Sequence, residues 1–178
     1  MRATIGLFVM LSLGALGCAH VPTQPGARAD LHAAARQTLH QMEQRDPTLR
    51  PLIADSAGYI VFPVIGQGGF LIGGGSGAGV AYEANGATHF AELSHLDAGA
   101  LAGGQRYAEV VVVRDEQTLA ALREGRYDFG ATASAVILHS GAAKTASFDR
   151  KGVAVFVSPI RGAMVNASVS GQHIKLTL

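Results

Sequence analysis

The sequence predicts an α+β fold in which N-terminal helices pack on a largely antiparallel, strongly bent sheet or partly closed β-barrel. Two observations carry this prediction. Apolar residues recur at helical spacing mainly near the N-terminus, between residues 30 and 56. Beyond that region, short apolar runs follow one another, and turn residues separate nearly all of them. These runs cover residues 59–64, 70–72, 80–82, 90–93, 110–113, 136–138, 153–157, 164–169 and 173–178.

The first residues have the pattern of a bacterial lipoprotein signal peptide over residues 1–17. Arg2 precedes an apolar stretch too short to cross a membrane as a helix, and a small residue comes before Cys18. The resemblance implies that Cys18 is lipidated, with palmitate among its acyl chains, and becomes the first mature residue. Ala19 is similar to the residue that follows the cysteine in outer-membrane lipoproteins. The alternative is an ordinary secretory signal that leaves Cys18 as a free thiol.

After the signal we expect a tether at residues 18–29 and one domain at residues 30–178. Two prolines and a glycine interrupt regular structure in the tether. Asp30 is expected to cap an amphipathic helix, and a second short helix is expected at residues 52–56. The apolar face of the first helix would consist of Leu31, Ala35, Leu39 and Met42.

Two further local signals lie among the strands. Asn85 and Gly86 form the dipeptide most typical of a tight hairpin turn, because both can adopt positive φ. Asp115 can cap a third helix, which Gly125 would end. Ser170-Gly171 resembles the turn of a last hairpin.

The glycine-dense run at residues 69–80 imitates phosphate-binding motifs but lacks their context. A dinucleotide-binding loop needs a helix directly after its glycines, whereas here a strand and a hairpin turn are expected. A P-loop needs Gly-Lys-Ser or Gly-Lys-Thr, which the chain does not contain, and the residues around Ser76 lack the final glycine of a nucleophile elbow. We therefore expect these glycines to serve a bent, closely packed pair of strands.

Composition excludes several classes of function. Cys18 is the only cysteine, so the chain can form no internal disulfide and no cysteine-based zinc site. The full chain has 14 Lys and Arg and 13 Asp and Glu. Removal of residues 1–17 takes away Arg2, so the mature chain would have 13 of each. A net charge of zero argues against nonspecific nucleic-acid binding. No cofactor is expected.

An ordered set of blocks carries a family resemblance. The blocks are residues 57–63, 69–80, 103–113, 129–134, 147–152, Gly162 and 170–171. Together they resemble the SYLF domain, also known as the Ysc84 actin-binding domain. The chain departs from the family pattern at residues 87–89, where it has no tryptophan, and at residues 154–158, where a glycine is missing.

The resemblance implies phospholipid binding. Eukaryotic members bind phosphoinositides and some bundle actin, whereas bacterial members are mostly secreted or lipid-anchored. Actin is not an expected target for a bacterial envelope protein, so anionic phospholipid is the ligand that the resemblance leaves.

The histidines and carboxylates give little support for a metal site or a catalytic group. His32 and His40 share a helix face with Arg36 between them, and a cation there opposes metal binding, so no metal site is expected. Ser94, His95 and Asp97 lie too close in sequence to form a catalytic group readily, and we expect polar turn residues there. Three strand carboxylates are expected to face solvent: Glu83, Glu92 and Glu109.

Basic residues are the remaining candidates for a site. The expected lipid-binding set is Arg36, Arg45, Arg50, Arg150 and Lys151. Each cation near an anionic membrane contributes about 1 kcal/mol. The expected function is that of a non-enzymatic lipoprotein of the bacterial outer membrane, periplasm-facing or surface-exposed, that binds anionic phospholipid. The alternative is an envelope structural or assembly module that binds protein partners through its sheet edges and helix.

Overall fold

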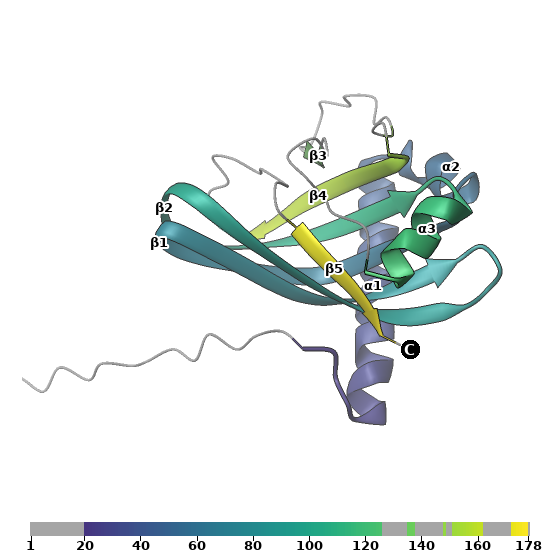
Figure 1. Cartoon of the computed structure of the whole chain (residues 1–178), viewed down its shortest axis with the longest axis horizontal. Coiled ribbons are helices and arrows are strands. Elements are labelled where there is room, and N and C mark those ends of the chain that lie inside the picture. The colour runs from purple at the N-terminus through teal and green to yellow at the C-terminus, as the bar shows by residue number, and fades with distance from the viewer. Residues whose placement is uncertain (1–19, 126–134, 138–147, 149–150, 162–171, 178) are drawn as a thin grey trace, which may run out of the picture.

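The computed structural model describes residues 20–125, 135–137, 148, 151–161 and 172–177 (Figure 1). Its elements follow the order of an α+β fold, with two helices first and most of the strands after them. They are α1 (Pro25–Arg45), α2 (Leu49–Ala54), β1 (Gly58–Glu83), β2 (Thr88–Val113), α3 (Glu116–Arg123), β3 (Ala135–Ile137), β4 (Val153–Arg161) and β5 (Gln172–Thr177). The fold class predicted from the sequence is confirmed.

One long hairpin of β1 and β2 forms most of the sheet. Its register runs from Gly58 opposite Val113 to Tyr82 opposite Thr88, and the predicted turn at Gly86 has φ +88°. Both strands curve back at the end of the molecule that lies farthest from α2 and α3 (Figure 1). Register shifts interrupt the pairing between Phe62 and Ile65 and again between Phe70 and Ile72. Shifts of this kind bend a strand, so the strongly bent sheet follows from the register itself.

The glycine run lies inside β1 and does not separate two strands. A Cβ atom at Gly79 would lie 2.6 Å from the carbonyl oxygen of Val61, and one at Gly77 would lie 2.9 Å from that of Val64. The two halves of β1 therefore approach each other more closely than any side chain allows. These glycines are architectural, as the sequence predicted.

The remaining strands attach to the other edge of β2. β4 pairs antiparallel with residues 106–113, and β5 pairs antiparallel with residues 90–95. The short β3 joins β4 in parallel. Within the described part of the chain the sheet is bent but not closed into a barrel.

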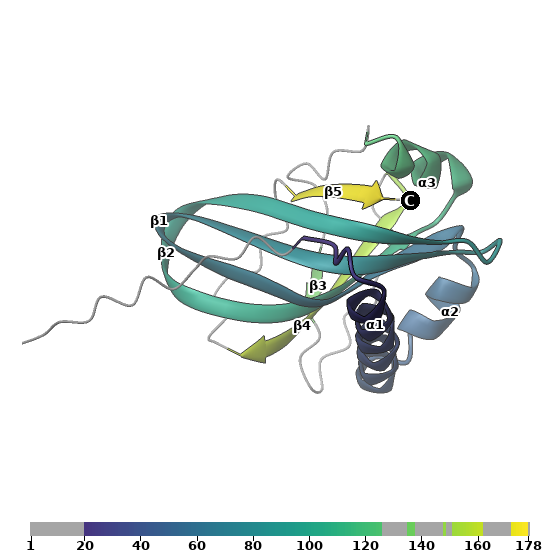
Figure 2. The same ribbon diagram turned by 90° about the horizontal axis from the view of Figure 1, so that it is seen from below.

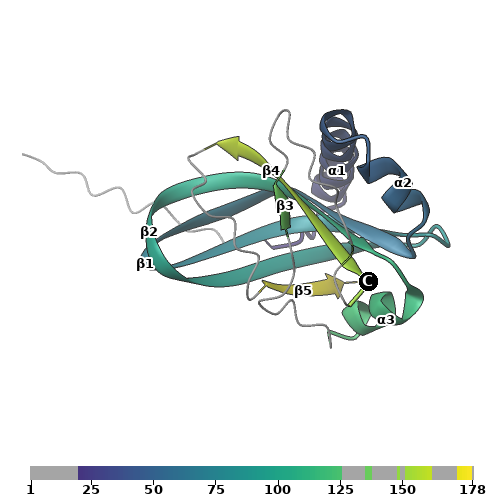
Figure 3. The same ribbon diagram turned by 90° about the horizontal axis from the view of Figure 1, so that it is seen from above.

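Near its helical end the sheet is buried on both faces. Figures 2 and 3 show α1 and α2 on one side of the hairpin and α3 with β5 on the other. The α1 side has a core cluster that includes Met42, Val110 and Phe156. The α3 side has a cluster that includes Phe62 and Leu122. Because both faces are covered, residues 110–113 are apolar at every position.

The helices differ from the sequence prediction mainly at their ends. α1 begins at Pro25, with Gln24 as N-cap, so it extends five residues into the predicted tether and Asp30 is not its cap. Proline is well tolerated in the first turn, which explains how it can begin the helix. α2 ends at Ala54, earlier than expected. The Asp115 cap of α3 is confirmed, because its side chain accepts a hydrogen bond from the Thr118 amide. The apolar run at 164–169 and the turn at 170–171 lie outside the described residues.

Candidate functional site

The three predicted arginines on α1 and α2 are exposed, but two of them have partners within the domain. Arg45, the last residue of α1, donates from Nη1 to the Ser158 hydroxyl at 2.5 Å. Arg50 on α2 forms an ion pair with Glu43 at 3.0 Å, and its side chain is 73% exposed. Arg36 lies near the middle of α1 and acts electrostatically on Tyr82. Arg45 is therefore oriented by the sheet, and the charge of Arg50 is partly offset.

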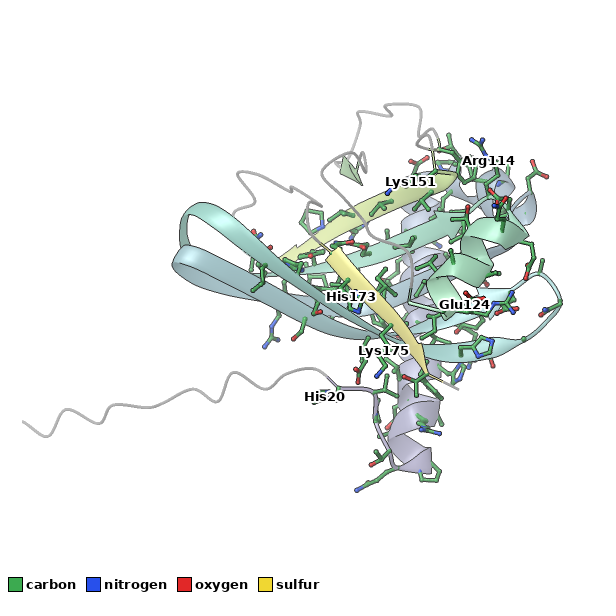
Figure 4. The ribbon with its side chains drawn as sticks, viewed as in Figure 1. His20, Arg114, Glu124, Lys151, His173 and Lys175 are labelled. Carbon is green, nitrogen blue, oxygen red and sulfur yellow. The ribbon has the colours of Figure 1, made fainter. Side chains whose placement is uncertain are left out.

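A second basic group lies at the junction of β2, α3 and β4. The Arg114 amide donates to the Gly152 carbonyl at 2.8 Å, which places Lys151 beside Arg114. Figure 4 shows both side chains at the helical end of the molecule. The Arg114 guanidinium lies over the Phe148 ring, 4.3 Å from the ring centroid, in a cation–π contact. Arg150, the remaining predicted residue, lies outside the described residues.

The sequence reasoning missed Arg114. It directly follows the apolar run 110–113 and precedes the helix cap, so it is the first side chain outside the sheet at this end. A cation directly after one apolar strand and the basic pair Arg150-Lys151 directly before another could have indicated a shared basic site. The predicted set is thus divided between α1 with α2 and this junction, rather than gathered at one place.

Ser94 and His95 are not placed to form a catalytic pair. Ser94 and His95 are successive residues of β2 and point to opposite faces, with Ser94 exposed and His95 buried. The turn expected there is wrong, since β2 continues through these positions. The side chain of Asp97 lies outside the described set. No group of three or more His, Cys, Asp or Glu that could hold a metal occurs among the described residues.

Two of the three strand carboxylates are buried, which contradicts the expectation that they face solvent. The side chain of Glu83 is 2% exposed and lies 3.0 Å from His89 Nε2 and 3.5 Å from Arg123 Nε. Glu109 is fully buried and accepts one hydrogen bond at 3.0 Å from Gln172 Nε2. Both carboxylates are buried because each side chain projects from the sheet toward another element, Glu83 toward α3 and Glu109 toward β5.

Burial is the main cause that raises the pKa of Glu109, to about 7, and the Gln172 hydrogen bond opposes it only in part. Among the described residues, Oε1 of Glu109 and Oε1 of Gln172 have no hydrogen-bond partner. Tyr107, Glu109 and Val111 alternate onto the same face of β2. Both neighbouring positions in sequence are also apolar, and a stretch of strand that is apolar on both faces is a signal that a carboxylate within it is buried.

Glu92 alone of the three carboxylates is accessible, and it binds the N-terminal segment. Its Oε1 accepts from the Val21 amide at 2.9 Å and lies 3.3 Å from His20 Nδ1. The Val21 hydrogen bond is the largest cause that lowers the pKa of Glu92, and His20 and Lys175 act in the same direction. His20 and Val21 therefore contact the sheet, although the sequence predicted a tether there.

Comparison with known proteins supports the family resemblance over the C-terminal part of the chain. Residues 94–176 match the family model Ysc84, described as Las17-binding protein actin regulator. The match begins within β2 and extends into β5, so the glycine run and all of β1 precede it. No curated protein matches the chain. None of the described helices is long and apolar enough to cross a membrane. The region from residue 94 to residue 176 thus belongs to the Ysc84, or SYLF, domain family.

Proposed function

We propose that the protein is a non-enzymatic lipoprotein of the bacterial outer membrane whose SYLF domain binds anionic phospholipid. The observation that carries the lipid-binding part is the adjacency of Arg114 and Lys151, which come from segments 37 residues apart and meet through the Arg114 to Gly152 hydrogen bond. Two cations held at one end of a domain can contact a phosphate group from two directions. The Phe148 ring lies 4.3 Å from the Arg114 guanidinium and restricts its movement.

The predicted arginines form a second, separate basic group on α1 and α2. Arg36 is exposed on α1, and Arg45 is fixed by Ser158. Arg50 contributes less, because Glu43 offsets its charge. Lipidation of Cys18 would keep the domain at a membrane, where even weak headgroup contacts are made at high local concentration.

The absence of catalysis is supported by the opposite orientations of Ser94 and His95. A nucleophile and its base must lie within hydrogen-bond distance, and successive strand residues on opposite faces do not. The buried Glu109 lies in the domain interior and has no access to a large substrate.

Vesicle flotation of a Cys18→Ser variant tests the lipid-binding part without the anchor. Removing a cation near an anionic surface costs about 1 kcal/mol, and reversing it about twice that. Lys151→Glu and Arg114→Glu should each weaken partitioning into phosphatidylglycerol vesicles by about 30-fold. Arg106→Glu is the matched control, because Arg106 is exposed on β2 away from the junction and the charge change is the same.

Equal recovery with neutral and anionic vesicles, or an equal effect of the control, would refute lipid binding through these residues. The competing function is binding of a protein partner in the envelope. Crosslinking in intact cells addresses it directly, since an assembly module should have a stable protein neighbour.

A further inference from the structure

The N-terminal segment leaves the domain at a fixed point. In addition to the Val21 contact with Glu92, the Pro22 carbonyl accepts a hydrogen bond from Arg28 Nε at 2.8 Å. The same guanidinium lies 4.8 Å from the centroid of the Phe90 ring on β2. Residues 20–22 are therefore held against the sheet by contacts from two elements.

This point is close to the proposed lipid attachment. Only Ala19 separates Cys18 from His20. Consecutive Cα atoms are 3.8 Å apart, so the Cα of Cys18 lies within about 8 Å of that of His20 whatever the conformation between them. An acylated Cys18 would bring the surface around Glu92 to the bilayer.

The surface next to this point is exposed and partly apolar. Glu92, Ser94 and Leu96 alternate onto the outer face of β2, and β5 places Lys175 opposite Glu92 and His173 opposite Ser94. We refer to these five residues as the anchor-side face. Leu96 is 79% exposed, and it lies about 13 Å from Glu92 toward the bend of the hairpin. The sequence from Gly66 to Ser76, which forms the β1 side of that bend, contains no Asp, Glu, Lys or Arg.

We propose that the anchor-side face, with Leu96 at its apolar end, lies on the bilayer that holds the lipid anchor. This inference rests on the proposed lipidation of Cys18. Lys175 and His173 are placed to meet phosphate headgroups, while Leu96 reaches the boundary with the acyl chains. Figure 4 shows His173 and Lys175 on β5 and His20 on the N-terminal segment below the hairpin.

Arg114 and Lys151 lie at the helical end of the molecule, whereas the bend lies at the opposite end in all three ribbon views. A domain docked by the anchor-side face thus has the basic junction at the end of the molecule opposite the bend, as a separate charged surface.

Spin labels on the lipidated protein test this orientation. Cys18 is the only cysteine, and an acylated sulfur does not react with thiol reagents, so Leu96→Cys and Gln117→Cys each provide a single site. Gln117 is exposed on α3, far from the bend. The measurement uses vesicles of phosphatidylethanolamine and phosphatidylglycerol. At each label it gives the ratio of the collision rate with oxygen to the collision rate with a water-soluble nickel complex. This ratio should be severalfold higher for the label at 96 than for the label at 117.

The possible outcomes separate this inference from the proposed function. Mass spectrometry of the N-terminal peptide establishes whether Cys18 is acylated. Equal accessibility at both sites on an acylated protein overturns the inference and leaves the anchor intact. Shielding of the label at 96 from both reagents means that protein covers the face, which also overturns it. A protein without lipid on Cys18 overturns both the inference and the proposed anchor.

Discussion

Replacement of Glu109 by Gln should make the protein more stable at alkaline pH and remove much of its pH dependence. Glu109 is fully buried, and its pKa is raised from 4.5 to about 7, mainly by burial. Between these two values the folded protein binds a proton that the unfolded chain does not. The free energy of unfolding therefore falls as pH rises through this window.

The size of the effect follows from the interval between the two pKa values. At about 1.4 kcal/mol per pH unit, the interval from 4.5 to about 7 corresponds to about 3 kcal/mol. This contribution is fully present below pH 4.5 and lost above pH 7. A Gln side chain does not titrate, has nearly the same shape, and can still accept the hydrogen bond from Gln172. The stability of the variant relative to the native protein should rise by about 3 kcal/mol between pH 4.5 and pH 8.

Urea denaturation at several pH values measures this difference. Far-UV circular dichroism is the suitable signal, because the chain has no tryptophan. Glu116→Gln is the matched control, since Glu116 is exposed on α3 and its pairing with Arg123 lies at the surface. A stability difference between native protein and Glu109→Gln that stays constant from pH 4.5 to pH 8 would refute the assignment of a buried, proton-binding carboxyl group.

Two further substitutions test the architecture by urea denaturation. Gly79→Ala should destabilise by at least about 1–3 kcal/mol, because its Cβ would lie 2.6 Å from the Val61 carbonyl oxygen. Gly66→Ala, in the same strand but with nothing within 4 Å, should change stability by less than about 0.5 kcal/mol, and equal effects would contradict the close approach. Asp115→Ala should cost about 1 kcal/mol by removing the cap bond from Thr118, whereas Asp115→Asn should retain most of it.

Local signals in the sequence predicted local structure well. The Asn85-Gly86 turn and the Asp115 cap each depend on one or two residues whose backbone preferences or side-chain oxygen determine the conformation. The start of α1 was wrong because Pro25 and Gly26 were interpreted as breakers, although proline is also suited to a first helical turn.

The continuity of β1 through its glycines could not be predicted in this way. Glycine occurs both at turns and where two backbones lie close together, so its presence in the sequence does not tell which of these applies. The short distance between Gly79 and the Val61 carbonyl oxygen identifies a close backbone contact. The same limitation applies to the site. Arg114 and Lys151 are 37 residues apart, and their adjacency depends on the order in which β4 joins β2.

The strand β2 explains why burial and binding divide along the molecule. At residues 110–113 helices and strands cover both faces, so every side chain there is buried and can contribute only to stability. At residues 92–96 only the inner face is covered, and Leu93 and His95 are buried while Ser94 and Leu96 are exposed. A large partner such as a bilayer can contact β2 only where this second layer is missing. The N-terminal segment meets β2 in that singly covered half, at Glu92, and the basic junction begins directly beyond the doubly covered half, at Arg114. The two proposed contact surfaces are therefore the two places where the cover of a single strand ends.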